Sequence, residues 1–492
     1  MASLSRFCCA LVLGRNRHFF RTQVPALSAF SVLPSLWQQE WHVAQQSRLQ
    51  RQLLEFDSCI GSQREEHERE LNGSESSQHQ QSVQRFFGAS CAALANIVWW
   101  LILIIKTLAY TLTRAQLLHD LYVAFYDAAR HKHKMSYVVK FERNLKNNLD
   151  SLCTDLLTHQ YVAQPSTCFV VDYPKKREVF AAMFRDRVVH HLYFNYTHQM
   201  FERTFIADSY SCIKGRGTLY GVNRLTQHIR QVSQNYAQPC YVMNIDIRGY
   251  FMHINRATLT AISTQSLKNM STHRIGTSED IGAPSGVMLT PHTTWSDVRD
   301  MNFILWLTKE IAMLDPMKNC IIVGDEINWE GMDKAKSMRY VAPGLALPIG
   351  NLTSQLFSNV YLNEFDQYVK RTLHCTHYGR YVDDAAIVSA DRDWLLQQVP
   401  ILRNFLLNHL GLQMHMGKLH IRNAYYGVEF LGTFIKPWRN YVSNKTLRRM
   451  RQHMAELQGC NQHRIQSAAI SYMGVLSHTA SHNIAMSKPK AA

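Results

Sequence analysis

The chain has 492 residues and a mass of 56.9 kDa, enough to bury a large core and to form more than one domain. Hydrophobic residues make up 46% and aromatic residues 11%, a composition that excludes an intrinsically disordered protein. The formal charge is +16, and residues 114–492 carry most of it, with 43 Lys and Arg against 29 Asp and Glu. This excess favours a polyanionic partner, since each neutralised phosphate releases condensed counterions.

Residues 1–113 form a poorly defined N-terminal extension. The first 39 residues contain four arginines and no acid, as a transit peptide does, and residues 60–83 are polar enough to predict a flexible linker. An apolar stretch at 91–112 approaches transmembrane length, but Asn96 and Lys106 interrupt it. Three interpretations stay open: a membrane anchor, a buried helix, or translated sequence upstream of the true start codon.

From Arg114 onward, helices and short strands alternate. Hydrophobic periodicity predicts helices over 114–131, 136–160, 353–372 and 444–457, and strands over 168–171, 241–245 and 385–389. Strands that bear acids, with helices between them, indicate an α+β sheet domain with helices packed on one face.

The cysteines and histidines show no metal-ligand spacing. The eleven cysteines form no CxxC pair, and the 24 histidines form no HExxH motif. Neither a zinc site nor a disulfide framework is therefore indicated, and a reducing compartment is the default. His190, His191 and His377 are expected to be core or surface residues.

Tyr381-Val382-Asp383-Asp384 lies between two apolar stretches. Adjacent carboxylates in such a setting repel each other and lose hydration unless cations neutralise them. Polymerases have this need, because carboxylates hold two Mg²⁺ ions that clamp the attacking hydroxyl and the leaving pyrophosphate. A charged hairpin tip explains the tetrapeptide equally well on its own.

A second acid, Asp246, directly follows the predicted strand 241–245 and should project from its C-terminal end. It either caps the next helix or faces Asp383 and Asp384 across adjacent strands, where three carboxylates would suit two hard cations. Phe251, five residues later, is either a core aromatic or a flat side chain that closes off the 2′ face of a sugar.

The segment 347–356 combines Pro348 and Gly350 just before a helix-compatible run. Gly350 permits close backbone approach, so this helix start suits a position beneath a template–primer base pair. The alternative is an ordinary turn, with Asn351 or Thr353 capping the helix.

These features occur in the order of reverse-transcriptase motifs: Asp246 with Phe251, then segments 348–355, 381–384 and 427–432. Upstream segments 174–180, 184–191 and 208–218 strengthen the match. Over about residues 114–485 the chain resembles prokaryotic or phage reverse transcriptases of the group II intron–retron lineage. Ile349-Gly350 with Ser354-Gln355, in place of the Gln-Gly and Ser-Pro of most relatives, is similar to diversity-generating retroelement enzymes, and so is the tail 471–478.

The resemblance implies a right-hand polymerase with N-terminal helices and fingers over 114–235, a palm with an antiparallel sheet over 236–439 and a small helical thumb over 440–492. Asp246, Asp383 and Asp384 would be the catalytic residues and would hold two Mg²⁺ ions, for which Mn²⁺ can substitute. The nucleotide-binding residues would be Lys176 and Arg177 on the triphosphate, Phe251 as sugar gate, and Ile349, Gly350, Ser354 and Gln355 in the nucleotide–template pocket. Lys418 falls where the family often has a lysine that protonates pyrophosphate, although the usual preceding proline is missing; a solvated surface lysine is the alternative.

The expected function is RNA-directed DNA synthesis by a cytoplasmic prokaryotic enzyme that binds dNTPs, a template RNA and the primer–cDNA duplex. An isoleucine at 349 removes a polar anchor near the nucleotide, so we expect error-prone synthesis and, by family analogy, misincorporation opposite template adenines. Four basic residues predict a thumb helix that grips the duplex, unless it is merely solvated: Lys445, Arg448, Arg449 and Arg451. Such enzymes use a basic accessory protein. The alternatives are an antiphage-defence or retron-type reverse transcriptase and a non-catalytic RNA-binding maturation factor.

Overall fold

The computed structural model describes residues 111–172, 175–275 and 292–480, which belong to the second of two compact units, Ala109–Ala492. The predicted linker at 60–83 and nearly all of the apolar stretch at 91–112 lie outside the described residues. No helix in the described part of the chain has both the length and the apolar character that a bilayer span requires.

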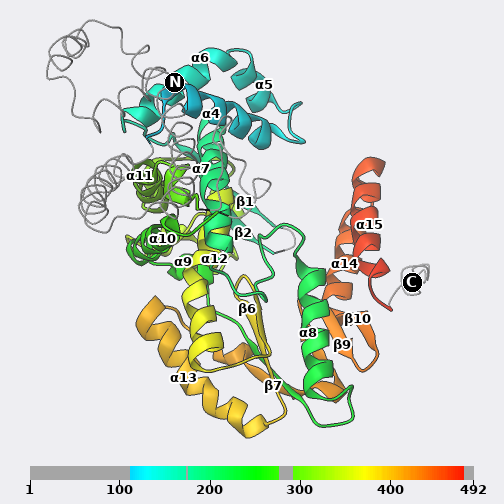
Figure 1. Cartoon of the computed structure of the whole chain (residues 1–492). Coiled ribbons are helices and arrows are strands. Elements are labelled where there is room, and N and C mark those ends of the chain that lie inside the picture. Colours follow the sequence, from blue (N-terminus) through cyan, green and yellow to red (C-terminus); the bar gives the residue numbers. More distant parts are fainter. Residues whose placement is uncertain (1–110, 173–174, 276–291, 481–492) are drawn as a thin grey trace, which may run out of the picture. The chain divides into compact units, whose positions relative to one another are not determined.

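Helices and strands alternate along the unit, as expected for an α+β protein (Figure 1). The helices are α4 (Arg114–Ala129), α5 (Ser136–Glu142), α6 (Leu145–Leu157), α7 (Phe184–Glu202), α8 (Thr218–Val232), α9 (Tyr250–His253), α10 (Arg256–Ser271), α11 (Met301–Ala312), α12 (Leu352–Gln367), α13 (Arg392–Leu410), α14 (Asn444–Glu456) and α15 (Gln462–Ser477). The strands are β1 (Ser166–Val171), β2 (Arg177–Ala181), β3 (Tyr241–Ile245), β4 (Cys320–Ile322), β5 (Tyr378–Tyr381), β6 (Asp384–Ser389), β7 (His420–Asn423), β8 (Val428–Phe430), β9 (Thr433–Lys436) and β10 (Arg439–Val442).

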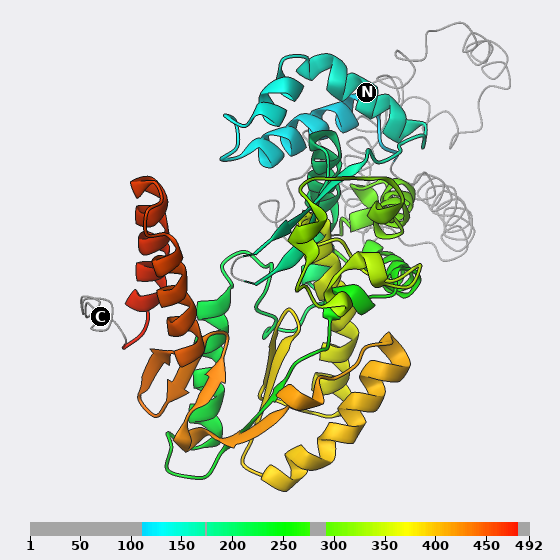
Figure 2. The ribbon, with the colours of Figure 1, turned by 180° about the vertical axis from the view of Figure 1, so that it is seen from behind.

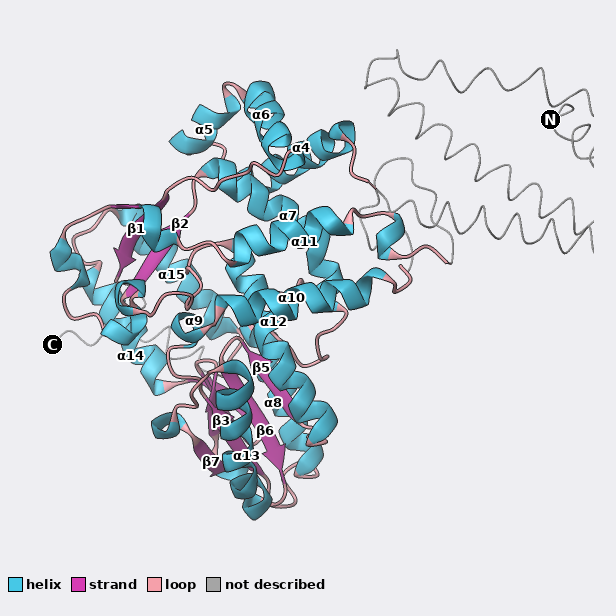
Figure 3. Ribbon diagram, turned by 90° about the vertical axis from the view of Figure 1, so that its left-hand side faces the viewer, coloured by secondary structure: helices cyan, strands magenta, loops and turns pink. Residues whose placement is uncertain are grey.

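The central sheet has four antiparallel strands in the order β5-β6-β3-β7 (Figure 3). Met243 and Ile387 point into the main core, which also contains residues of α12 and α13. Val242 and Val388 point to the opposite face, into a second core that contains residues of α8. The expectation of helices on one face is therefore wrong, and the reason is visible in β6, where Ala385–Val388 are all buried.

Two smaller sheets flank the central one. In the first, β1 pairs with β2 antiparallel and with β4 parallel. In the second, β8, β9 and β10 form an antiparallel meander, and β9 contacts α8 (Figure 2). The main core itself lies among α4, α6, α7, α10, α11 and α12, which pack on one another through residues such as Leu121, Leu149 and Leu192.

Most predicted elements are present, with shifted ends. The strand at 241–245 is confirmed, whereas the predicted helix 136–160 is two helices, because Asn144 has a non-helical backbone (φ −128°, ψ 39°). The run at 353–372 is α12 followed by a π-helical turn, Tyr368–Thr372. The basic helix predicted at 444–457 is α14.

Candidate active site

The register of the central strands brings the predicted acids to one end of the sheet. Ile245 at the end of β3 pairs with Ala385 in β6, so Asp246 and Asp384 are neighbours on adjacent antiparallel strands. Tyr381 pairs with Asp384, which leaves Val382 and Asp383 as the turn between β5 and β6. The segment is therefore a hairpin tip, and Asp246 lies across from it on the neighbouring strand.

The carboxylates of the three acids are close enough to raise the pKa values of Asp383 and Asp384. Desolvation by the surrounding protein, followed by repulsion from Asp383 and Asp246, raises the pKa of Asp384 to about 7. Desolvation and repulsion from Asp246 also raise the pKa of Asp383. The Asp384 side chain is nevertheless solvent-exposed, although many protein atoms lie around it. An ion or a substrate can therefore reach this carboxylate from solvent.

Lys418 supplies a positive charge at this site. Its Nζ lies 2.7 Å from Asp246 Oδ2, and the preceding segment is held in place by a hydrogen bond from the His415 amide to the Asp246 carbonyl (2.8 Å). Lys418 also lowers the pKa values of Asp383 and Asp384. Lys418 is exposed, but it is not an isolated surface lysine, because its ammonium group neutralises the first of the three acids.

Further basic side chains surround the acids. Burial, followed by repulsion from Arg449, Arg177, Lys418 and Lys445, lowers the pKa of Lys175. The basic side chains at and just before the start of β2 therefore lie close to basic side chains of α14. Lys175 was missed at the sequence level, where its only signal was its place in a run of three basic residues.

Lys176 points elsewhere. Its Nζ donates to the Glu330 carbonyl (2.7 Å) and lies 3.7 Å from Asp172 Oδ1. Arg177, at the start of β2, is exposed and close enough to lower the pKa of Asp383. Of the two residues predicted to hold a triphosphate, the structure thus brings Arg177 to the acids and turns Lys176 toward a neighbouring loop.

The turn before α12 is locked against β2. The Phe180 amide donates to the Ile349 carbonyl (2.8 Å), and Gly350 has φ +127°. A Cβ at Gly350 would meet the Phe180 carbonyl oxygen at 2.8 Å, so no larger residue fits without a shift of the backbone. Phe251 and Ile349 are both partly buried against one apolar cluster with Phe180 and Met252. Phe251 and Ile349, which were each predicted to bind the nucleotide, therefore lie against the same cluster.

The polar side chains at the start of α12 contact other parts of the fold. Asn351 and Thr353 do not cap α12 with their side chains. Asn351 Oδ1 instead accepts from the Ala182 amide (3.4 Å), and Thr353 Oγ1 shares a 2.7 Å hydrogen bond with His190 Nδ1. Ser354 is buried, whereas Gln355 is exposed beside the Cys212 thiol (3.7 Å).

A buried ion pair lies beneath the acidic hairpin. Arg380 Nε and Nη2 donate to the two carboxylate oxygens of Asp366 at 2.8 and 2.6 Å, and Tyr378 Oη donates to Asp366 Oδ1 at 2.6 Å. Arg380 Nη1 also donates to the Val382 carbonyl in the turn (2.7 Å). The Val382 amide in turn donates to Ser211 Oγ (3.2 Å). This network was missed at the sequence level, although Arg380 directly precedes the tetrapeptide.

The turn needs such support because Val382 has φ +53°. A β-branched residue in the left-handed region is strained by about 1–3 kcal/mol and persists only where its surroundings hold it there. Hydrogen bonds to both its amide and its carbonyl provide this restraint.

The three acids fit a magnesium site in charge and in donor chemistry, since all their donor atoms are carboxylate oxygens. Among residues 111–172, 175–275 and 292–480, however, no three His, Cys, Asp or Glu side chains are drawn together as metal ligands are. One oxygen of Asp246 is taken by Lys418. A metal would therefore have to compete with that ammonium group.

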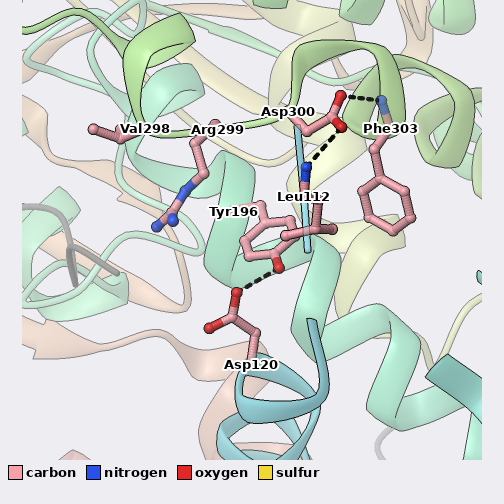
Figure 4. A pocket seen from close by; sticks show the side chains of 7 residues that line it. All are labelled: Leu112, Asp120, Tyr196, Val298, Arg299, Asp300 and Phe303. Atoms are coloured by element: carbon pink, nitrogen blue, oxygen red, sulfur yellow. Dashed lines mark hydrogen bonds between the residues drawn. The ribbon is translucent and has the colours of Figure 1, made fainter. Parts of the chain in front are cut away.

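A small cavity of about 10 Å³ lies between α4, α7 and the start of α11 (Figure 4). Tyr196 Oη donates to Asp120 (2.6 Å), while Asp300 accepts from the amides of Phe303 (3.0 Å) and Leu112 (3.1 Å). The hydrogen bonds around this cavity hold α4 and the segment before it in place. The volume is no larger than one water molecule needs, so the cavity is too small for a ligand.

Comparison with known proteins gives structural likeness only. No protein-family model and no curated protein matches the sequence. Telomerase from Candida albicans, solved with the TWJ fragment of telomeric RNA, is similar at 10% identity and a TM-score of 0.38, over 60% of this chain and 51% of that one. Apo telomerase from Candida tropicalis, truncated from its C-terminal domain, is similar at 11% identity and a TM-score of 0.39, over 60% and 59%. The chain thus spans little more than half of these solved chains, and likeness at this level carries no argument about activity.

Proposed function

We propose that the chain is an RNA-directed DNA polymerase of the reverse-transcriptase type. The observation that carries the proposal is the pairing of Ile245 with Ala385, which makes neighbours of Asp246 and Asp384 and sets Asp383 in the adjoining turn. Acids far apart in sequence lie at one end of the two inner strands of the sheet, next to basic side chains suited to phosphate. Copying of an RNA template is supported by the ordered reverse-transcriptase motifs of the sequence.

In this proposal Asp246, Asp383 and Asp384 hold two Mg²⁺ ions, which would activate the primer hydroxyl and stabilise charge on the transferred phosphorus. Arg177 and Lys175 bind the triphosphate, because they lie near the acids. Lys418 would have to give up its contact with Asp246 for a metal to bind there, and its ammonium group would then be free to contact a phosphate. The Gly350 turn brings backbone close to the nascent base pair.

The architecture proposed for this activity is the right-hand one. The β1-β2-β4 sheet would belong to the fingers, the four-stranded sheet to the palm, and α14 with α15 to the thumb. Repulsion between Lys175 and both Arg449 and Lys445 supports the presence of a positively charged gap between fingers and thumb, as a nucleic-acid duplex requires.

Within this class we propose an error-prone enzyme of the diversity-generating type. The side chain of Ile349 packs with apolar neighbours and offers no hydrogen bond to a nucleotide or its template base. A pocket without that polar contact discriminates less strongly between right and wrong pairs. A retron-type or antiphage-defence enzyme is the alternative within the same chemistry.

The primary test is primer extension on an RNA template with the full-length chain and Mg²⁺. Asp383→Ala with Asp384→Ala should abolish cDNA synthesis while RNA retention on a filter stays at the wild-type level. Asp393→Ala removes an exposed carboxylate from the first turn of α13 and is the matched control, expected to retain full activity. Wild-type synthesis by the double variant would refute the site assignment, and absence of synthesis by the wild type would favour the non-catalytic RNA-binding factor.

The fidelity proposal has its own test. Ile349→Gln places an amide where the apolar side chain lies, and sequencing of the cDNA should then show fewer errors opposite template adenines. Ile349→Val, which keeps the pocket apolar, is the control. An unchanged adenine error rate in Ile349→Gln contradicts the proposal while leaving the polymerase assignment intact.

A further inference from the structure

A basic hollow of about 460 Å³ opens where three helices end. Arg203 is the C-cap of α7, Arg274 follows the C-terminus of α10, and Arg371 lies in the π-helical turn after α12. His273 adds an imidazole to the lining. The other lining residues are Thr204, Met270, Asn363 and Gln367.

Among the described residues, no carboxylate pairs with the arginines of the basic hollow, and Arg203 lies over the Trp295 ring (5.5 Å to its centroid). Arg203, Arg274 and Arg371 are all exposed, and none of the described residues that line the hollow carries a carboxylate. Within the described part of the chain, none of the three guanidinium groups forms an ion pair. Their hydrogen bonds go to neutral acceptors: Arg203 donates to the Arg274 carbonyl (3.0 Å), and Arg371 donates to Gln367 Oε1 (3.4 Å).

The floor of the basic hollow is built from interlocked amides. Gln367 Nε2 donates to the Thr204 carbonyl (2.7 Å) and to Asn363 Oδ1 (3.2 Å). Asn363 Nδ2 donates to Thr204 Oγ1 (3.3 Å). These hydrogen bonds join the segment directly after α7 to α12, so the backbone next to Arg203 is held against the helix that precedes Arg371. Such pre-organisation lowers the entropic cost of binding an anion.

Helix dipoles alone offer a simpler account of these arginines. A cation near a helix C-terminus stabilises it by about 0.3–1 kcal/mol, and each arginine lies at such a position. That account predicts an effect on stability and none on ligand binding. It also does not require the three charges to share one concave surface.

The residues that line the basic hollow include none of the three acids, Asp246, Asp383 and Asp384. Ser354, near the proposed nucleotide pocket, and Arg371 are about 17 residues apart, or roughly 25 Å along a helix. Its open shape and its fork-like donors suit a chain of phosphodiesters better than a small enclosed ligand. We propose that the basic hollow binds the sugar–phosphate backbone of a nucleic acid outside the template–primer duplex. This inference goes beyond the polymerase proposal and does not depend on it.

The test compares two triple variants of the full-length chain. Arg203→Gln, Arg274→Gln and Arg371→Gln together neutralise the basic hollow. Lys140→Gln, Arg143→Gln and Lys146→Gln remove the same charge from exposed positions on α5, α6 and their connection. Each is titrated against a long structured RNA, a double-stranded DNA of equal length and a short primer–template, at several salt concentrations.

For the hollow variant we expect affinity for the long RNA to fall about 10- to 100-fold near 0.1 M salt, and the log–log salt slope to drop by roughly 2–3. Extension of the short primer–template should be unchanged, which separates this inference from the catalytic one. An equal loss for DNA identifies a general backbone contact, and a loss for RNA alone identifies an RNA contact; both support the proposal. A fall in melting temperature without loss of binding, or an equal loss in the control triple, overturns it.

Discussion

Removal of the Asp366 carboxylate should greatly lower the free energy of unfolding, although Asp366 is not one of the three acids. The Arg380 side chain is 1% exposed and that of Asp366 is 0% exposed, so Asp366→Ala leaves a buried guanidinium without a counter-charge. Breaking a buried pair from one side typically costs about 3–5 kcal/mol. Tyr378 loses the acceptor for its hydroxyl at the same time, which adds about 1–3 kcal/mol. The sum is a large fraction of the roughly 5–15 kcal/mol that stabilises an ordinary domain.

Urea unfolding followed by circular dichroism measures this loss, with Asp393→Ala as an exposed control expected within about 0.5 kcal/mol of wild type. The informative variant removes both partners, Asp366→Leu with Arg380→Met. Because no charge is then left buried, most of the lost stability should return. Its primer extension should stay low, since the bond from Arg380 to the Val382 carbonyl is gone.

Two results would refute this reasoning. The first is a loss below about 1 kcal/mol in Asp366→Ala, which would mean that water or another group satisfies Arg380. The second is full activity in the double variant, which would show that the turn holds its shape without the arginine.

Gly350→Ala should reduce both stability and primer extension, because the added Cβ would meet the Phe180 carbonyl oxygen. Gly344→Ala is the control for backbone strain alone, since Gly344 also has a positive φ (+84°) but has open space where the Cβ would lie. Equal losses of primer extension in the two variants would contradict the contact argument. Burial lowers the pKa of His190 from 6.5 to about 4, so below pH 6.5 the unfolded chain binds this proton more readily than the folded one. The free energy of unfolding should therefore be highest above pH 6.5 and fall by up to about 3 kcal/mol as the pH drops toward 4. Urea unfolding at pH 7.5 and pH 5 should show this loss in the wild type and less of it in His190→Gln, and identical pH profiles would disprove the assignment. Lys418→Gln frees an oxygen of Asp246, so primer extension should reach half its maximum at lower Mg²⁺ but with a lower maximal rate; a magnesium titration that leaves both values unchanged excludes the proposed competition.

The strands and the acids of the site could be predicted from sequence because their signals are local. An apolar run that ends in Asp246, and a second that follows Asp383-Asp384, are each read from a few neighbouring residues. Their meeting depends on the pairing of Ile245 with Ala385, which the periodicity of either strand alone does not specify.

What was missed depends on contacts between distant segments. Lys175 and Lys176 are indistinguishable in sequence, and only the loop that carries Glu330 decides which one turns away. Asp366 lies in the interior of a helix, where nothing in the local pattern marks it as the partner of Arg380. The expectation of helices on one face was wrong because Ala385–Val388 in β6 are buried on both faces of the sheet.

The strand register also determines where the gene tolerates changes in length. Since side chains alternate along a strand, a slip of one residue in β6 against β3 would turn Asp384 to the other face and exchange the two cores behind it. An insertion or deletion of one residue within 241–245 or 384–389 should therefore abolish activity. The connection around 330–334, which is largely exposed and has no strand register to keep, should accept such changes. Length variation among descendants of this gene is expected to accumulate there, while the two central strands keep their spacing to the residue.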